Sequence, residues 1–389
     1  WVLAKLIQFL VLQKAPAPVS RERRQFLTLV GLGSATILVT ATGISLMDED
    51  ESVPVTGDGV NGLPDVNAST TSGPAQSPPA GELNNRIEPA PGTRPELTAN
   101  ENFYRIDINT IPPSVNGETW RLAVGGLVDN PLELTLEEIR SRPAHSQAIT
   151  LECISNRLAG DLISTSMWTG VRLKDILEEA GLRQGAQEVY IESADGFYES
   201  VPMSDAMDES TLLVYEMNGE ALPEPHGFPL RIYIPNRFGM KQPKWITRME
   251  VIDHEGAGYW VERGWSDTAI PPTTSVIDTV AADSAESGSN GANGRVLPVG
   301  GIAYAGARGI SKVEVQVDDG PWEAAELRDP PLSPLTWVQW RYEWAAQPGQ
   351  HTFRVRAYDG NGDPQPTEGS EPHPAGATGI HSVSERISE

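Results

Sequence analysis

Cys153 is the residue of this sequence with the clearest capacity for chemistry. It is the chain's one cysteine, so no intrachain disulfide can form. No group of cysteines and histidines has the spacing of a zinc site, and no C-x-x-C-H sequence could attach haem. Taken alone, a single cysteine is more often a small buried core residue. If the chain carries a metal or redox centre, that centre must be a bound cofactor to which one thiolate adds a ligand.

The segments around Cys153 predict short strands and helices that could position it. Residues 148–153 form a strand pattern with Cys153 at its end. Thr135 is expected to cap a helix over 134–141, and Gly181 to end an amphipathic helix over 171–180. Further strands are predicted at 120–124, 188–193 and 230–234. This mixture, without a regular β-α-β rhythm, predicts an α+β fold. Because no G-x-G-x-x-G follows a strand and no P-loop is present, nucleotide-binding folds are disfavoured.

Four linked motifs carry a resemblance to a known family. They occur in the order ITLECISN (149–156), SMWTGVRLKDIL (166–177), YEMNGEALPEPHGFPLRIYIP (215–235) and FGMKQPKWI (238–246). In order and spacing they resemble the molybdopterin-binding domain of the sulfite oxidase family, and especially its bacterial membrane-anchored branch. The resemblance runs from about Phe103 to the C-terminus. It implies a molybdenum–molybdopterin cofactor, one per chain.

The resemblance also assigns site residues. Cys153 matches the thiolate ligand of molybdenum, which needs one soft sulfur from the protein besides the pterin dithiolene. Arg105 matches the arginine that faces the substrate, and Arg157 follows where the family often carries basic residues; with Cys153 these are the expected catalytic residues. The residues expected to bind the cofactor are Asn156, Ser193, His226, Arg231, Lys241 and Lys244. Cations and donors of this kind suit a phosphate tail.

Two positions depart from the family pattern. Sulfite oxidases tend to have two arginines in a row, but here Leu158 follows Arg157, so the expected pocket is less positive. Trp265 stands where those enzymes have a tyrosine near the metal, and an indole only donates a hydrogen bond. Tyr259 could replace that tyrosine only if the loop folds differently. Whether sulfite is the substrate is therefore left open, and an S- or N-oxide is the alternative substrate.

The N-terminal region predicts a membrane anchor and a tether. Residues 26–46 carry no charge and are long enough to cross a bilayer. Arginines precede this stretch and acidic residues follow it, which places the rest of the chain outside the cell. The arginine pair also resembles a twin-arginine export signal. The chain begins with Trp1, so further segments are expected upstream. Residues 48–98 are acidic and rich in Pro, Gly and Ser, which is typical of a flexible linker.

The C-terminal region predicts a separate β domain. Alternating patterns at 336–344 and 351–359, and a hairpin pattern at 313–327, are typical of an immunoglobulin-like β-sandwich. It resembles the second domain of sulfite oxidases, which commonly serves dimerisation, so a homodimer is one expectation. The predicted division is a membrane anchor at 1–47, a linker at 48–98, a molybdopterin-binding domain at 99–272 and the sandwich at 273–389.

The leading hypothesis is a membrane-anchored oxidoreductase on the extracytoplasmic side of the cell membrane. It would transfer an oxygen atom to or from a small anionic or polar oxo substrate. Without haem or iron–sulfur ligands, it would need an external electron partner, either a membrane haem protein or a cytochrome. A formal net charge of -24 disfavours nucleic acid as a partner. The alternative hypothesis is a membrane-tethered binding module whose molybdopterin fold is inactive.

Overall fold

The computed structural model describes residues 87–284, 286–287 and 295–388. The predicted membrane helix at 26–46 and residues 48–86 of the predicted linker lie outside the described residues. Among the helices that are described, none has the length and hydropathy needed to cross a bilayer. Residues 87–98, at the end of the predicted linker, make fixed contacts: Ala90 is buried, and the Thr98 N–H donates to the Thr165 carbonyl at 2.7 Å.

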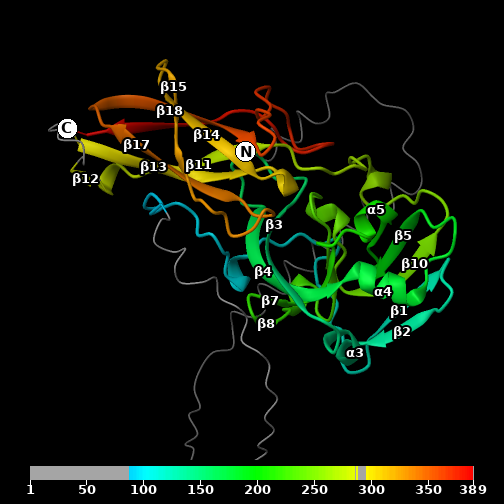
Figure 1. Cartoon of the computed structure of the whole chain (residues 1–389). Coiled ribbons are helices and arrows are strands. Elements are labelled where there is room, and N and C mark those ends of the chain that lie inside the picture. Colours follow the sequence, from blue (N-terminus) through cyan, green and yellow to red (C-terminus); the bar gives the residue numbers. More distant parts are fainter. Residues whose placement is uncertain (1–86, 285, 288–294, 389) are drawn as a thin grey trace, which may run out of the picture. The chain divides into compact units, whose positions relative to one another are not determined.

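Two sheets make up the central part of the chain (Figure 1). One has the strand order β2-β1-β10-β5-β6, in which β1 and β10 run parallel, and the other has the order β3-β4-β7-β8, with β9 paired to β7. The strands are β1 Arg121–Gly126, β2 Leu132–Thr135, β3 His145–Glu152, β4 Ile163–Arg172, β5 Glu188–Ser193, β6 Tyr198–Pro202, β7 Leu212–Met217, β8 Glu220–Ala221, β9 Arg231–Tyr233 and β10 Ile246–Ile252.

Helices are few and short. The α-helices of the described part are α3 Leu136–Arg140, α4 Leu173–Ala180 and α5 Met203–Ala206. The predicted cap of α3 is confirmed, since the Thr135 hydroxyl accepts the Glu138 N–H at 3.0 Å. The predicted end of α4 is also confirmed, because Gly181 takes a left-handed conformation with φ of 73°. The 3-10 turns are η3 Asn100–Asn102, η4 Glu224–His226, η5 Gly239–Lys241, η6 Val261–Arg263, η7 Ala282–Ser284 and η8 Gly306–Arg308. The fold is thus richer in strands than the α+β expectation implied.

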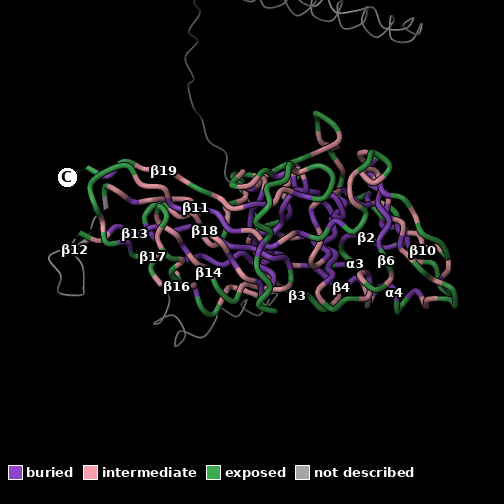
Figure 2. The backbone as a smooth tube through the Cα atoms, turned by 90° about the horizontal axis from the view of Figure 1, so that it is seen from above, coloured by how far each residue is buried: buried purple, intermediate pink, exposed green. Residues whose placement is uncertain are grey.

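The two central sheets share one hydrophobic core with α3 and α4 (Figure 2). Leu122 of β1, Ile191 of β5 and Met249 of β10 meet Ile176 of α4 and Leu213 of β7 in it, and all five side chains are fully buried. Burying side chains of this size stabilises the fold by roughly 1.5–3 kcal/mol each. The core therefore holds β9 and β10 beside the candidate site residues Arg231 and Lys244. Ile149 and Leu151 of β3 pack in a second cluster.

The C-terminal part consists of two further sheets, β11-β13-β17-β16 and β15-β14-β18-β19, joined mainly by antiparallel pairs. Their inner faces share a core that includes Leu297, Trp340 and Phe353. The predicted hairpin is confirmed by the antiparallel pair β14–β15. Two facing sheets agree with a sandwich; the immunoglobulin-like assignment stays a prediction. The strands are β11 Thr274–Val280, β12 Glu286–Ser287, β13 Arg295–Tyr304, β14 Ile310–Val317, β15 Trp322–Ala324, β16 Glu326–Leu327, β17 Val338–Ala345, β18 Gly349–Asp359 and β19 His381–Ile387.

Strand β3 is held from the C-terminal part of the chain. The Tyr304 hydroxyl donates to the Thr150 carbonyl at 3.1 Å, and the Trp337 N–H donates to the Thr150 hydroxyl at 2.8 Å. Ile163 of β4 packs with Ile302 of β13 in a small shared cluster. The strand that leads to Cys153 is therefore supported from both parts of the chain.

Candidate functional site

Cys153 lies directly after the last residue of β3 and faces a pocket. Side chains along a strand alternate between its faces. Accordingly Leu151 and Cys153 line this pocket, whereas Glu152 between them lines a smaller cleft on the other side. The pocket has an empty volume of about 890 Å³, which includes its open mouth.

The thiol of Cys153 is mostly buried, with 8% of the residue exposed. Its Sγ lies 3.0 Å from the Ser155 hydroxyl, and the Cys153 N–H donates to the Leu162 carbonyl. Burial raises the pKa of the thiol, and the hydrogen bond from Ser155 opposes that shift. Such a thiol is a poor free nucleophile at neutral pH. Because a bound metal cation deprotonates a coordinating thiol outright, the same environment suits a metal ligand.

A buried cation forms another part of the pocket. Arg231, the first residue of β9, is only 6% exposed, lies over the Trp168 ring at 5.0 Å and donates to the His226 carbonyl at 3.1 Å. No carboxylate of the described residues forms an ion pair with it. Burial lowers the pKa of Arg231 to about 10, which leaves it charged at neutral pH. A buried guanidinium without a carboxylate partner fits an anionic group such as the pterin phosphate.

His226 and Lys244 complete this basic side of the pocket. Burial, together with Arg231, lowers the pKa of His226 to about 4, so its ring is neutral and lies 3.1 Å from the Asn100 carbonyl oxygen. Burial and Arg231 also lower the pKa of Lys244 to about 8. Its ammonium group forms an ion pair with Asp107 and lies 4.5 Å from the centre of the Trp245 ring. These residues fit the phosphate end of a pterin cofactor.

The two predicted catalytic arginines do not line the pocket. The side chain of Arg105 is 38% exposed, and its Nε donates to Asp107 at 2.5 Å. Arg157 is exposed and borders the smaller cleft on the other side of β3. Asn156 borders that cleft too; its amide donates to Glu152 at 2.9 Å and its oxygen accepts the Leu162 N–H at 3.1 Å. In this conformation none of the three faces the Cys153 thiol across the pocket.

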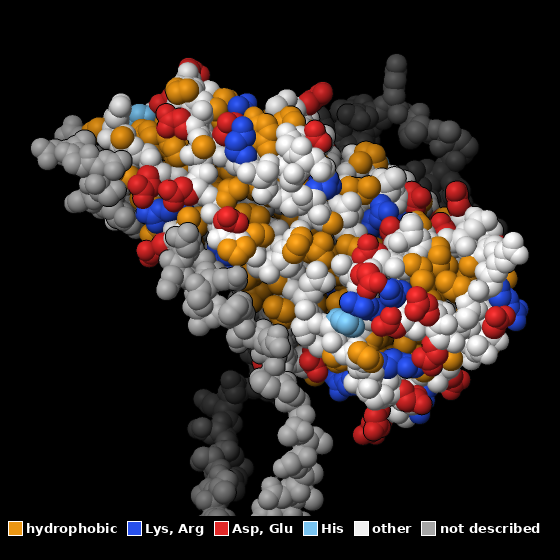
Figure 3. Space-filling view, in the orientation of Figure 1, with side chains coloured by type: hydrophobic (Ala, Val, Ile, Leu, Met, Phe, Trp, Pro, Cys, Tyr) orange, Lys and Arg blue, Asp and Glu red, His pale blue; other side chains and the backbone are white. Residues whose placement is uncertain are grey.

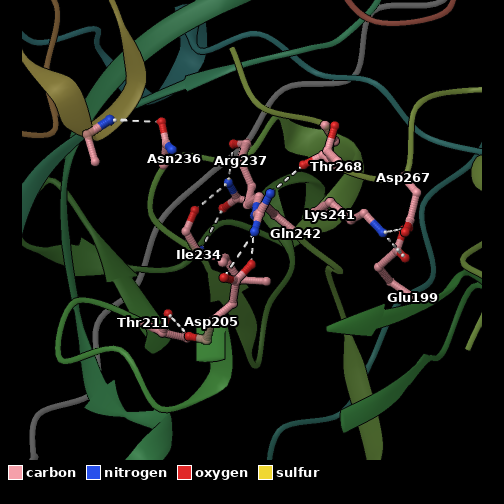
Figure 4. A network of polar contacts seen from close by, with 12 residues as sticks. Glu199, Asp205, Thr211, Ile234, Asn236, Arg237, Lys241, Gln242, Asp267 and Thr268 are labelled. Atoms are coloured by element: carbon pink, nitrogen blue, oxygen red, sulfur yellow. Dashed lines mark hydrogen bonds and ion pairs between the residues drawn. The ribbon is translucent and has the colours of Figure 1, made fainter. Parts of the chain in front are cut away.

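Two predicted cofactor-binding residues also lie outside the pocket lining. Ser193 is buried, and its hydroxyl has no hydrogen-bond partner among the described residues. Lys241 is buried between two carboxylates, with its Nζ 2.9 Å from Glu199 and 2.8 Å from Asp267 (Figure 4). Lys241 therefore joins η5 to the loop that carries Asp267. Of the nine predicted site residues, the structure brings Cys153, His226, Arg231 and Lys244 together at the pocket.

A further part of the pocket lining, called here the aromatic wall, is formed by large apolar side chains. Trp260, Trp265 and Phe197 line it together with Met240. Trp265 thus stands at the pocket, as the sequence comparison expects. Tyr259 does not line the pocket, and the guanidinium of Arg263 lies 3.4 Å from its ring centre. These large side chains give the space beside Cys153 a mostly apolar lining.

Sequence analysis missed Tyr104 as a site residue. It lines the pocket, and its ring stacks on Phe103 at 5.5 Å. Burial, and to a lesser degree the charge of Cys153, raises the pKa of Tyr104 well above the usual range of a phenol. The motif analysis singled out its neighbour Arg105 instead. Because segment 103–109 forms no regular strand, no alternation rule indicated which of the two side chains faces inward.

Comparison with known proteins bears on the identity of this site. The model of the family described as "Oxidoreductase molybdopterin binding domain" matches residues 109–260. Sulfite oxidase of Gallus gallus is 32% identical over 316 residues, covering 69% of this chain and 68% of that protein. Mitochondrial sulfite oxidase of Rattus norvegicus is 30% identical, covering 65% of this chain and 54% of that protein, so the chain spans about half the length of that relative.

A solved structure supports the fold. The sulfane dehydrogenase of Paracoccus pantotrophus superposes with a TM-score of 0.60 over 72% of this chain and 80% of that one, at 22% sequence identity. At this identity the likeness concerns the fold. The curated relatives and the thiol-lined pocket with its buried arginine agree on the cofactor. This chain belongs to the sulfite oxidase family of molybdopterin-binding oxidoreductases, and its cofactor is the molybdenum–molybdopterin group.

Proposed function

We propose that the chain catalyses a two-electron oxygen-atom transfer on a small S-oxo or N-oxo substrate. The observation that carries this proposal is the pocket itself, in which the Cys153 thiol and the buried, carboxylate-free Arg231 open into one space. In the oxidising direction, the substrate gains an oxygen atom from water while two protons and two electrons are released. The reducing direction is the reverse.

The chain's own residues have distinct tasks in this proposal. Cys153 Sγ would hold the metal, and Arg231, Lys244 and His226 would hold the phosphate end of the pterin. When bound, the cofactor supplies the two-electron oxygen-transfer chemistry. Trp260 and Trp265 would keep bulk water from the reacting centre, which strengthens the electrostatic interactions inside the pocket.

The test is metal analysis of cofactor-loaded protein together with the Cys153→Ser variant. We expect about one molybdenum per chain in the unchanged protein. In the variant we expect loss of activity with an unaltered circular dichroism spectrum, because serine keeps the shape of the side chain but is a far weaker ligand for a soft site. A folded protein that contains neither molybdenum nor pterin after expression in a competent host would contradict the proposal.

The substrate and the electron partner belong to the same proposal. Sulfite oxidation is favoured by the relatives, which are named for it, whereas the aromatic wall and the outward-facing Arg105 favour a neutral S- or N-oxide. Turnover rates measured on sulfite, methionine sulfoxide and an amine oxide, with a dye as the redox partner, distinguish these substrate classes. A chain with a single cysteine has no iron–sulfur ligand set, so electrons would pass to an external haem protein. Turnover without any added electron donor or acceptor would contradict that step.

An extracytoplasmic location is also part of the proposal. It is supported by the uncharged stretch at 26–46 with arginines before it and acidic residues after it. Digestion of intact spheroplasts with an added protease should remove the catalytic part if this placement is correct. A binding module with an inactive pocket is the second candidate function, and bound molybdenum with turnover would exclude it.

A further inference from the structure

Tyr104 presents an unused hydroxyl to the pocket. It is the single tyrosine among the pocket-lining residues of the described chain. Its hydroxyl has no hydrogen-bond partner among the described residues. By contrast, the hydroxyl of Tyr304 donates to the Thr150 carbonyl and that of Tyr198 to a Glu262 oxygen. A phenol near water-excluding aromatic rings ordinarily finds a partner. The hydroxyl is therefore open to the pocket, where water or a bound ligand can be its partner.

The surroundings fix this hydroxyl in place. The Tyr104 ring stacks on Phe103, and the Tyr104 N–H donates to the Ser164 hydroxyl at 3.1 Å. Its oxygen lies against Gly239 of η5, where an added Cβ would sit 2.6 Å from it. Only glycine at 239 leaves room for the hydroxyl at this point. The donor is thus positioned before any ligand binds, a property expected of groups that stabilise a developing charge.

Three other donors in or beside the pocket already have partners. The Ser155 hydroxyl lies 3.0 Å from Cys153 Sγ, and the Lys244 ammonium is paired with Asp107. Arg105 faces Asp107 as well. An ordinary phenol keeps its proton at neutral pH and is therefore able to donate.

We propose that the Tyr104 hydroxyl is the hydrogen-bond donor to the oxygen atom that is transferred at this site. The proposal rests on the oxygen-transfer function proposed above. It assigns to Tyr104 the orienting task that the sequence comparison gave to Arg105. A hydrogen bond to an oxygen that gains charge during the reaction lowers the barrier, and losing one typically costs about tenfold in rate.

The experiment compares holoenzyme of the unchanged chain with Tyr104→Phe and with Gly239→Ala. The first removes the hydroxyl and keeps the ring. The second leaves Tyr104 intact but displaces its hydroxyl, because the new methyl group would occupy its place. Tyr259→Phe serves as the matched control, since that phenol does not line the pocket. We expect equal molybdenum content in all four proteins. In both test variants we expect kcat/KM to fall about tenfold, chiefly through kcat, and the midpoint potential of the metal to shift.

Each outcome decides the matter. If Tyr104→Phe retains its kcat/KM and its potential, the proposal is wrong. It is equally wrong if Tyr259→Phe changes both quantities as much, because the effect would then be a general one of the aromatic cluster. If the loaded protein binds molybdenum but turns over no substrate, the proposed function is wrong. The midpoint potential of the metal in Tyr104→Phe then tests the role of Tyr104 by itself.

Discussion

At the scale of single residues, Glu152 shows that the strand leading to Cys153 also carries a buried acid. Its side chain is 7% exposed; Oε1 accepts the Asn156 amide at 2.9 Å, and Oε2 has no partner among the described residues. Burial raises the pKa of Glu152 from 4.5 to about 7, and the Asn156 hydrogen bond opposes that shift only in part. Since the neutral acid is favoured in the folded state, the folded protein binds this proton more tightly than the unfolded chain does.

The consequence is a pH-dependent stability that Glu152→Gln should remove. The contribution of Glu152 is fully present below pH 4.5 and is lost as pH rises through about 7. The shift corresponds to about 3 kcal/mol at most. We expect the free energy of unfolding of the unchanged protein to fall between pH 5 and pH 8 by more than that of Glu152→Gln, measured by urea denaturation at each pH. Parallel pH profiles for the two proteins would refute the assignment.

Four of the predicted site residues, Cys153, His226, Arg231 and Lys244, lie at one pocket, and the order of the motifs was enough to group them. It could not give the direction of Arg105, which lies in an irregular segment, and it missed Tyr104 for the same reason. Lys241 and Lys244 are close in sequence, yet the 3-10 turn η5 sends them to different partners. Side-chain direction in such turns depends on tertiary contacts, which motif order does not contain.

At the scale of elements, the loop between β10 and β11 supplies Trp260 and Trp265 to the aromatic wall of the pocket and is held by two cations, Lys241 and Arg237 (Figure 4). Lys241 binds Asp267, and Arg237 donates to the Thr268 carbonyl at 2.5 Å. The Phe238 N–H donates to the Ala269 carbonyl at 2.8 Å. These contacts place Trp265 at the pocket although the loop contains no regular structure except η6.

We therefore expect Lys241→Met to destabilise the protein by about 3 kcal/mol, because it leaves the fully buried Glu199 without its cation. The double variant Lys241→Met/Glu199→Gln should recover part of that loss, since no buried charge then remains. Asp267→Asn is the matched control and should cost less than about 1 kcal/mol, because the Asp267 side chain is 71% exposed. Thermal denaturation of the four proteins measures these differences. If Lys241 contacts the cofactor instead, Lys241→Met would lose molybdopterin with little change in the stability of the cofactor-free protein.

At the scale of the whole described chain, the surface charge could be predicted from the sequence, whereas the packing of the C-terminal strands could not. Acidic side chains are spread over the face in Figure 3 with basic ones among them, in keeping with the net charge of -24. A surface of this charge affects the solubility of the protein and its choice of partners, but it does not determine the fold. The presence of β strands after residue 273 was predictable from alternating patterns. Their attachment to β3 was not, because it depends on contacts between residues more than a hundred positions apart, such as Thr150 and Tyr304.

This attachment couples the C-terminal sheets to the strand that leads to Cys153. Ile302 is 3% exposed and packs in the cluster that also contains Ile163 and Trp337. Ile302→Ala should cost about 2–5 kcal/mol. Trp337 and Tyr304 hold β3, which ends beside Cys153. We therefore expect Ile302→Ala to lower the urea midpoint of cofactor release and the urea midpoint of strand unfolding by the same amount. Urea titrations followed by cofactor absorbance and by far-ultraviolet circular dichroism would test this, with Val315→Ala in the C-terminal core as the matched control. Coincident transitions in all three proteins are the expected result. A cofactor transition that stays in place while the dichroism transition moves would show that the C-terminal sheets unfold independently of the site.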